Sequence, residues 1–316
     1  YTLSLHDALP IYIKCVRIFT EFINLKLKGF LKMEKTRRTL LRCLFLIIIT
    51  GVIFTLTSCG QNGQKTEIAR EPTKSILESV LKSGELRVGL ESGYMPFEMT
   101  NKQGNFVGFD IDIAKEMAKA MGVKFVPVNT AWDGIIPALL TNKFDIIISG
   151  MTVTQERNLK VNFADPVIVV GQTILINKKI RRSVKSYKDL NNPKYIVTSA
   201  LGTTGEQSVK KYMPKCKYKS FDERTEAVLS VINGKADAFV YDLPFCVVVM
   251  AEQGAGKLVF LDEPFTYEPL AWAMRKGDHD FLNFLNNFLR QIKNDGRYDR
   301  IYNKWIKSTK WLKEIK

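Results

Sequence analysis

The chain is poor in the residues that most often carry catalysis or hold metal ions. Only two histidines, His6 and His279, occur among 316 residues, so chemistry that needs histidine as a base or a ligand is close to excluded. Five cysteines occur, but none forms a C-x-x-C pair or has a histidine at ligand spacing. A zinc site is therefore unsupported, and we expect neither a metal nor a cofactor.

Long apolar runs and nucleic-acid-binding motifs are also lacking. The main charge-free apolar stretch, residues 43–56, is shorter than the ~20 residues that a membrane-spanning helix needs. The net charge is +15, from 47 Lys+Arg and 32 Asp+Glu, but these charges are spread along the chain and do not alternate with aromatic residues. This distribution favours a solvated, lysine-rich surface over a nucleic-acid partner.

The first 32 residues are not expected to belong to the natural protein. Residues 1–11 (YTLSLHDALPI) read like the translation of a common sequencing-library adapter, and residues 12–32 would be translated upstream sequence. We expect the natural start at Met33. The alternative is a genuine basic N-terminal arm.

Residues 33–58 have the pattern of an export signal. A positively charged segment precedes the apolar stretch, which ends in the sequence LTSCG, and its length fits the core of a signal peptide. This end resembles the lipobox of bacterial lipoproteins, in which Cys59 would be lipidated. The alternative is an uncleaved anchor, and both place the mature chain outside the cytoplasmic membrane. Residues 59–74 are polar without periodicity, and we expect a flexible tether.

From residue 75 the hydrophobic pattern alternates between strands and helices. The first unit is predicted to contain a helix at 76–83, strands at 86–90, 124–128 and 144–149, and helices at 109–121 and 134–140. The second is predicted to contain strands at 173–176, 195–199, 216–221 and 236–241, with helices ending near 212 and 232. A strand at 270–274 and helices within 280–307 follow. This order predicts two α/β lobes with parallel strands and a cleft between them.

Residues 144–166 (FDIIISGMTVTQERNLKVNFADP) contain the most informative cluster of polar residues. An apolar strand stops at a glycine, and two threonines and Arg157 follow. Ligands of open α/β sheets bind beyond the carboxyl ends of such strands. An arginine there can hold a carboxylate through two parallel hydrogen bonds. The alternative is a surface arginine that pairs with Glu156 or Asp165.

Five motifs in order make the chain resemble the bacterial extracellular solute-binding proteins of the amino-acid type, family 3. The resemblance covers about residues 75–310. The motifs are Tyr94-Met95-Pro96-Phe97-Glu98, the GFDIDIA segment from Gly108, the GIIPAL segment from Gly134, Thr152-x-Thr154-x-Glu156-Arg157, and the DGRYDRIY segment from Asp295. Any one motif alone would be weak evidence.

The resemblance implies an α/β fold of the type II periplasmic-binding-protein (Venus-flytrap) kind. Each lobe would be a mostly parallel sheet flanked by helices, and two crossover strands would join the lobes. Residues 75–173 would form the first part of lobe 1, residues 174–267 lobe 2, and residues 268–316 the return to lobe 1. The expected protein is a monomeric substrate-binding lipoprotein of an amino-acid ABC importer, and its partners would be a permease and an ATPase.

The same resemblance assigns the ligand's α-carboxylate to residues from both lobes. Arg157 would grip it, and Thr152 would add a hydroxyl and a backbone N–H. Thr203 and Thr204 would present N–H groups at a helix start, which is a natural anion site. The two threonines could instead simply cap their own helix.

The ligand's ammonium and side chain would meet a second group of residues. Asp242 would pair with the ammonium, and Gly150 would offer its carbonyl. Tyr94 and Trp132 would sandwich the apolar stem of the side chain. Alternatives remain open, because Asp242 could be a helix N-cap and the two aromatic residues could be ordinary core residues.

Three further positions bear on the ligand's identity. Glu91 falls where relatives that select cationic side chains often carry an acid, and Ser149 is a compatible polar neighbour. Ala200 stands where some glutamine binders place a lysine. These residues favour a polar or basic amino acid, such as arginine, lysine, histidine or cystine. Glu91 could equally be a solvated loop acid.

Two other functions compete with import. A free-standing amino-acid sensor would use the same site, and the neighbouring genes would distinguish it. A dehydratase acting on cyclic carboxylic acids would need a positioned acid or base, for which Glu91 and Asp242 are the available carboxylates. A disulfide between Cys216 and Cys246 is permitted outside the cell, but two free thiols fit the spacing as well.

Overall fold

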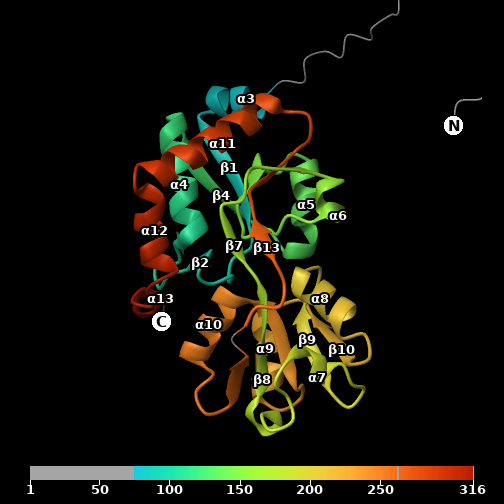
Figure 1. The fold of residues 1–316 in the computed structure, drawn as a ribbon. Coiled ribbons are helices and arrows are strands. Elements are labelled where there is room, and N and C mark those ends of the chain that lie inside the picture. The colour runs from blue at the N-terminus through green and yellow to red at the C-terminus, as the bar shows by residue number, and fades with distance from the viewer. Residues whose placement is uncertain (1–74, 262, 316) are drawn as a thin grey trace, which may run out of the picture. The chain divides into compact units, whose positions relative to one another are not determined.

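The computed structural model describes residues 75–261 and 263–315 (Figure 1). The expectations for residues 1–32, for the signal segment 33–58, for lipidation of Cys59 and for the tether 59–74 lie outside the described residues. In the part that the structure describes, no helix has both the length and the apolarity to cross a membrane.

The first sheet contains the predicted βαβαβ unit and has the order β4-β1-β5-β14-β6. β1 is parallel to both β4 and β5, whereas β14 is antiparallel to β5 and β6. Its strands are β1 (Glu85–Leu90), β4 (Lys124–Asn129), β5 (Ile146–Ile147), β6 (Asn162–Phe163) and β14 (Ala273–Met274). We call residues 75–167 and 271–315, which surround this sheet, lobe 1.

The helices of lobe 1 begin and end where the sequence places suitable caps. The Ser75 hydroxyl caps α3 by accepting from Leu77 N–H, and left-handed Gly84 and Gly122 end α3 and α4 because glycine adopts positive φ without strain. The helices are α3 (Ile76–Ser83), α4 (Phe109–Met121), α5 (Trp132–Leu140), α6 (Gln155–Asn158), α11 (His279–Asn294), α12 (Arg297–Trp305) and α13 (Leu312–Ile315). α12 packs on α4 and α11, and a short hairpin, β2 (Met99–Thr100) with β3 (Phe106–Val107), precedes α4.

The second sheet has the order β10-β9-β11-β8-β12. β9 is parallel to β10 and β11, and β8 is antiparallel to β11 and β12. Its elements are β8 (Gln172–Asn177), β9 (Ile196–Ala200), β10 (Lys217–Phe221), β11 (Ala238–Asp242), β12 (Leu258–Leu261), α7 (Tyr187–Leu190), α8 (Thr204–Tyr212), α9 (Arg224–Ile232), α10 (Leu243–Glu252) and the 3-10 turn Lys178–Ile180. We call residues 171–261 and 263–267 lobe 2.

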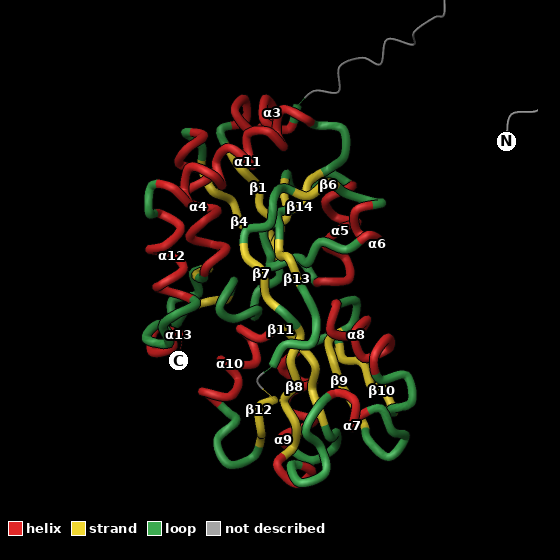
Figure 2. Tube along the Cα trace, viewed as in Figure 1, coloured by secondary structure: helices red, strands yellow, loops and turns green. Residues whose placement is uncertain are grey.

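Two strands connect the lobes, as the resemblance implied. β7 (Ile168–Val170) leads into β8, β13 (Glu268–Leu270) leads back to β14, and the two pair antiparallel. They run side by side between the two groups of elements (Figures 1 and 2). β8 and β14, the strands next to these crossings, need no helical connection and are antiparallel to their neighbours. Both sheets are therefore mixed, whereas we expected each sheet to be mostly parallel.

The two cysteines of the described residues carry free thiols. Cys246 is fully buried on α10, and its Sγ lies 3.7 Å from the carbonyl oxygen of Tyr241. Cys216 is half-buried beside β10. The disulfide that the sequence left open is therefore not formed in this structure.

Candidate functional site

A small polar cavity is lined by residues from both lobes. It is nearly closed, with a volume of about 10 Å³, which is on the order of the space for one water molecule. Its lining residues are Tyr94, Trp132, Gly150, Thr152, Arg157, Gln172, Thr203, Thr204, Gly205, Tyr241 and Asp242. Eight of the ten ligand-binding residues predicted from the sequence are among them.

Arg157 is held by the turn that contains it. The Thr154 hydroxyl caps α6 by accepting from the Arg157 N–H at 3.1 Å. The Arg157 guanidinium donates to the Thr152 carbonyl in lobe 1 at 2.9 Å and to the Gly202 carbonyl in lobe 2 at 3.2 Å. Arg157 is only 7% exposed, and burial lowers the pKa of its guanidinium.

The alternative of a surface ion pair for Arg157 is wrong. Glu156 pairs with Lys160 at 3.6 Å, and Asp165 pairs with Arg290 at 3.8 Å. Arg157 instead bonds to two carbonyl groups, one in each lobe.

The start of α8 faces the same cavity. The Thr203 hydroxyl accepts from the Glu206 N–H at 3.3 Å and so caps its own helix, as the alternative reading held. The Thr204 hydroxyl lies 3.4 Å from that of Thr152 in lobe 1. The first N–H groups of a helix have no acceptor within it, so this end of α8 offers donors and a partial positive charge to an anion.

Asp242 ends β11 and stands at the N-cap position of α10, but its side chain makes no capping hydrogen bond. Its carboxylate accepts from the Tyr94 hydroxyl of lobe 1 and from the Gln172 amide. Burial raises the pKa of Asp242 to about 7, while the hydrogen bond from Tyr94 opposes that rise. The carboxylate therefore points into the site instead of serving the helix.

Gly150 and Tyr94 are in close contact on the lobe 1 side. Gly150 has a φ of +50°, and a Cβ placed on it would lie 2.3 Å from the Tyr94 ring. The Gly150 N–H donates to the buried Asp110 carboxylate at 2.7 Å. Trp132 is half-buried, and its indole N–H donates to the Gly202 carbonyl at 3.1 Å.

Three lining residues, Gln172, Gly205 and Tyr241, were not predicted from the sequence. The Gln172 amide nitrogen donates to Thr204 at 3.2 Å, while its side-chain oxygen is buried without a partner. An orphaned buried acceptor marks a place where a donor fits. The signal in the sequence was a lone amide, Gln172, just before the apolar run of β8.

Glu91 and Ser149 do not line this cavity. Glu91 is buried and forms an ion pair with Arg224 of lobe 2, so it is not the solvated loop acid of the alternative reading. Its other carboxylate oxygen accepts from the Trp132 N–H at 3.0 Å. The Ser149 hydroxyl donates to Glu98 at 2.5 Å and accepts from the Glu91 N–H at 3.1 Å.

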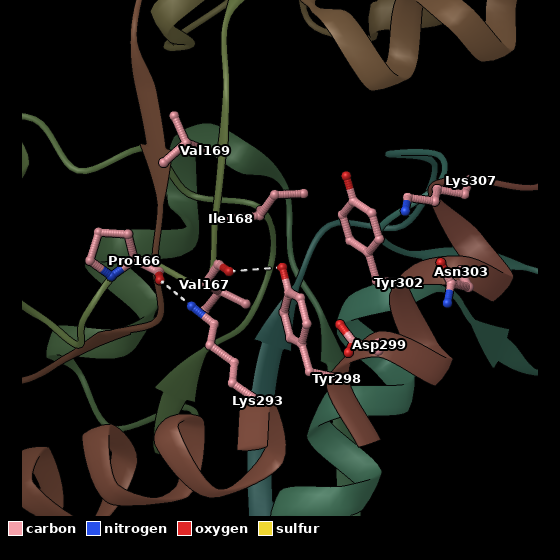
Figure 3. Close-up of a pocket in the computed structure, with 10 residues that line it drawn as sticks. All are labelled: Pro166, Val167, Ile168, Val169, Lys293, Tyr298, Asp299, Tyr302, Asn303 and Lys307. Carbon is pink, nitrogen blue, oxygen red and sulfur yellow. Dashed lines mark hydrogen bonds between the residues drawn. The ribbon is translucent and has the colours of Figure 1, made fainter. Parts of the chain in front are cut away.

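A larger hollow, of about 570 Å³, lies on lobe 1 beside the crossover strand β7 (Figure 3). Two of its polar groups already bond to the chain: the Lys293 ammonium donates to the Pro166 carbonyl at 3.2 Å, and the Tyr298 hydroxyl donates to the Val167 carbonyl at 3.0 Å. Its charged lining residues, Lys293, Asp299 and Lys307, all belong to lobe 1, whereas Arg157 and Asp242 belong to opposite lobes. We therefore take the smaller cavity as the candidate site. Over residues 75–261 and 263–315, no group of three or more His, Cys, Asp or Glu could hold a metal ion.

Comparison with known proteins identifies the family of the chain. The family model of the bacterial extracellular solute-binding proteins, family 3, matches residues 86–308. The ABC transporter glutamine-binding protein GlnH of Bacillus subtilis (strain 168) is 31% identical over 270 residues, which span 84% of this chain and 96% of that protein.

Two solved structures add to this. An ABC transporter binding component from Wolinella succinogenes DSM 1740, complexed with lysine, is 58% identical with a TM-score of 0.71, covering 73% of this chain and 99% of that one. An ancestral amino-acid-binding protein, described as a precursor of cyclohexadienyl dehydratase, is 47% identical with a TM-score of 0.69 and the same coverage. The chain belongs to the bacterial extracellular solute-binding proteins of family 3.

Proposed function

We propose that the chain captures a free L-amino acid between its lobes and delivers it to the permease of an ABC importer. The observation that carries the proposal is that Arg157 of lobe 1 and Asp242 of lobe 2 line the same cavity. A zwitterion presents one charge to each of these groups. A molecule that lacks either charge leaves a buried ion without its partner, which is costly.

The carboxylate end is built from a cation, a hydroxyl and a helix terminus. Arg157 now donates to the Gly202 carbonyl at 3.2 Å, and a carboxylate would replace that neutral acceptor with a charged one. Charge-assisted hydrogen bonds are about twice as strong as neutral ones. Thr152 and the first turn of α8 flank the same position, so the anion would be held from both lobes.

The ammonium end is built from acceptors. Asp242 supplies the charge, the unpartnered side-chain oxygen of Gln172 supplies a second acceptor, and the Gly150 carbonyl a third. Three acceptors match the three donors of an ammonium group. Tyr94 and Trp132 stand on the lobe 1 side of the cavity, where they would cover the side-chain stem.

Ligand entry requires the lobes to separate. The cavity volume of about 10 Å³ is far below the space that ligand pockets need. The lobes are joined by two paired three-residue strands, β7 and β13, so a hinge motion there would open the site. The closed state would then be favoured because the ligand touches both lobes only in that state.

The family places the chain outside the cytoplasm, and we infer that the lipid on Cys59 would hold it at the membrane. The permease and ATPase would then act on a monomeric, tethered carrier. A sensor that uses the same site is the second candidate. The dehydratase hypothesis has less support, although one relative is a precursor of such an enzyme. Glu91 forms an ion pair with Arg224 and is therefore not available as a general acid or base.

The decisive experiment is a thermal-shift screen with the twenty L-amino acids, cystine and ornithine. A ligand at ten times its Kd should stabilise the protein by about 1.4 kcal/mol. We expect Arg157→Ala to abolish the shift for every ligand, because each uses the same carboxylate site. Arg157→Lys should retain part of it.

The matched control is Arg290→Ala. Arg290 is also an arginine of lobe 1, but its side chain is 58% exposed and contacts Asp165 and Asn287 at the surface. This variant should keep the full ligand-induced shift. A full shift in Arg157→Ala would show that the cavity assigned here is not the binding site.

A further inference from the structure

A buried cation of the chain itself lies beside the proposed ligand site. Arg224 is the first residue of α9 in lobe 2 and is only 4% exposed. Its guanidinium pairs with Glu91 of lobe 1 and donates to the Tyr241 hydroxyl at 3.0 Å. It also lies 5.1 Å from the ring centroid of Tyr94.

The position of Arg224 is unfavourable for the fold taken by itself. A positive charge in the first turn opposes the helix dipole, which favours anions there. Burial of a guanidinium also carries a desolvation cost that pairing offsets only in part. Residues that break local rules are expected at functional sites.

The surroundings of Arg224 are those that a cationic ligand side chain would need. Glu91 supplies a carboxylate, and Tyr94 and Tyr241 supply ring faces at 5.1 and 5.5 Å from the guanidinium carbon. Such faces attract cations. Nearby Glu98 is fully buried, and one of its carboxylate oxygens has no partner. Arg224 therefore occupies a second cation-binding position.

Tyr94 connects this position to the amino-acid site. Its hydroxyl bonds to Asp242, the proposed partner of the ligand's ammonium, and its ring face is covered by Arg224. A ligand side chain that extends from the ammonium end and stacks on the Tyr94 ring would contact Arg224. The Arg224–Glu91 pair also spans the two lobes.

We propose that Arg224 sets the charge preference of the side-chain subsite by competing with a cationic ligand side chain for Glu91 and for the face of Tyr94. The inference rests on the amino-acid site proposed above. With Arg224 in place, a lysine or arginine ligand must displace it, whereas a neutral side chain need not. Removal of Arg224 frees an acid and an aromatic face for the ligand.

The test compares L-arginine with its neutral counterpart L-citrulline by calorimetry. In Arg224→Met, the ratio of the citrulline Kd to the arginine Kd should rise at least tenfold over that of the wild type. In the double variant Glu91→Gln/Arg224→Met the gain should disappear, because the acid is gone as well. Arg224→Lys should stay near the wild-type ratio.

The outcomes separate this inference from the function on which it rests. An unchanged or lower ratio in Arg224→Met, with binding intact, overturns the competitor role and leaves amino-acid capture standing. If the wild type binds no amino acid, both fall. Should Arg224→Met not fold, Arg224→Gln decides, because its neutral amide can still donate a hydrogen bond to Glu91. Its ratio should also rise at least tenfold over that of the wild type, and an unchanged ratio would contradict the inference.

Discussion

At the residue scale, the charge of the Asp242 carboxylate makes the electrostatics of the site depend on pH. The carboxylate is 5% exposed, and burial raises its pKa to about 7. The charged groups that act on it are Arg157, which lowers the pKa, and Glu268, which raises it. A carboxyl with this pKa is partly protonated at neutral pH, yet only its ionised form attracts an ammonium.

We therefore expect amino-acid affinity to depend on pH. Binding to the ionised form releases a proton below about pH 7, so the Kd should rise by up to about tenfold per pH unit as the pH falls below that value. Above about pH 8 the Kd should be flat. Calorimetry between about pH 5.5 and about pH 8.5 measures this, with proton release checked in two buffers of different ionisation enthalpy.

Asp242→Asn is the matched control for this prediction. The amide keeps the shape of the side chain but does not titrate, so its weaker binding should lose the pH dependence. A wild-type Kd that stays constant down to about pH 5.5 would contradict a pKa of about 7 for Asp242.

At the element scale, the segment before α4 shows how one glycine positions a helix. Gly108 precedes Phe109 with a φ of +140°, and a Cβ built on it would lie 2.1 Å from the Phe97 carbonyl oxygen. That backbone contact cannot relax through a side-chain rotation. α4 supplies Asp110, whose carboxylate holds the Gly150 N–H of the site at 2.7 Å.

Gly108→Ala should therefore lower the free energy of unfolding by about 3 kcal/mol, from steric overlap and backbone strain. Gly104→Ala is the control, because Gly104 also has a positive φ, of +77°, but faces open space. Its cost should be about 1 kcal/mol. Chemical denaturation of both variants makes the comparison, and equal costs would contradict the packing argument.

Most elements were predictable because their patterns are local. The helix at 109–121 and the strands at 124–129 and 196–200 were placed within a residue or two, since apolar periodicity and glycine stops mark them. The short strands β2, β3, β7 and β12 were missed or left as extended segments, because two to four residues carry no clear period. The antiparallel strands of each sheet depend on the crossings between lobes, which no local pattern reveals.

The site residues that belong to sequence motifs of the family could be predicted, and the others could not. Arg157 and Asp242 follow from the family pattern, and both line the cavity. The pairing of Glu91 with Arg224 was not predictable, because the partners are 133 positions apart and meet across the lobes. Gln172 and Tyr241 have ordinary strand positions, and only the fold brings them to the cavity.

At the scale of the whole molecule, Trp132 is placed to report the separation of the lobes. Its indole N–H donates to Gly202 of the other lobe at 3.1 Å, whereas Trp272 is buried in the core of lobe 1. Trp305 and Trp311 are buried too, but they line a separate cavity together with residues of lobe 2. We expect a saturating amino acid to shift the tryptophan emission because it changes the surroundings of Trp132.

The shift should be smaller in Trp132→Phe and persist in full in Trp272→Phe, because Trp272 lies in the core of lobe 1. Calorimetry on the same samples establishes that the ligand is bound in each case. An undiminished shift in Trp132→Phe would mean that the emission does not report the surroundings of Trp132.

The buried thiol on α10 provides a chemical probe of local unfolding in lobe 2. Cys246 is 0% exposed within lobe 2, and a thiol in such surroundings reacts only when its own region opens. Its alkylation rate, followed by peptide mass spectrometry, would measure how often lobe 2 unfolds. Hinge motion leaves the interior of the lobe intact. This rate therefore distinguishes local unfolding of lobe 2 from separation of the two lobes.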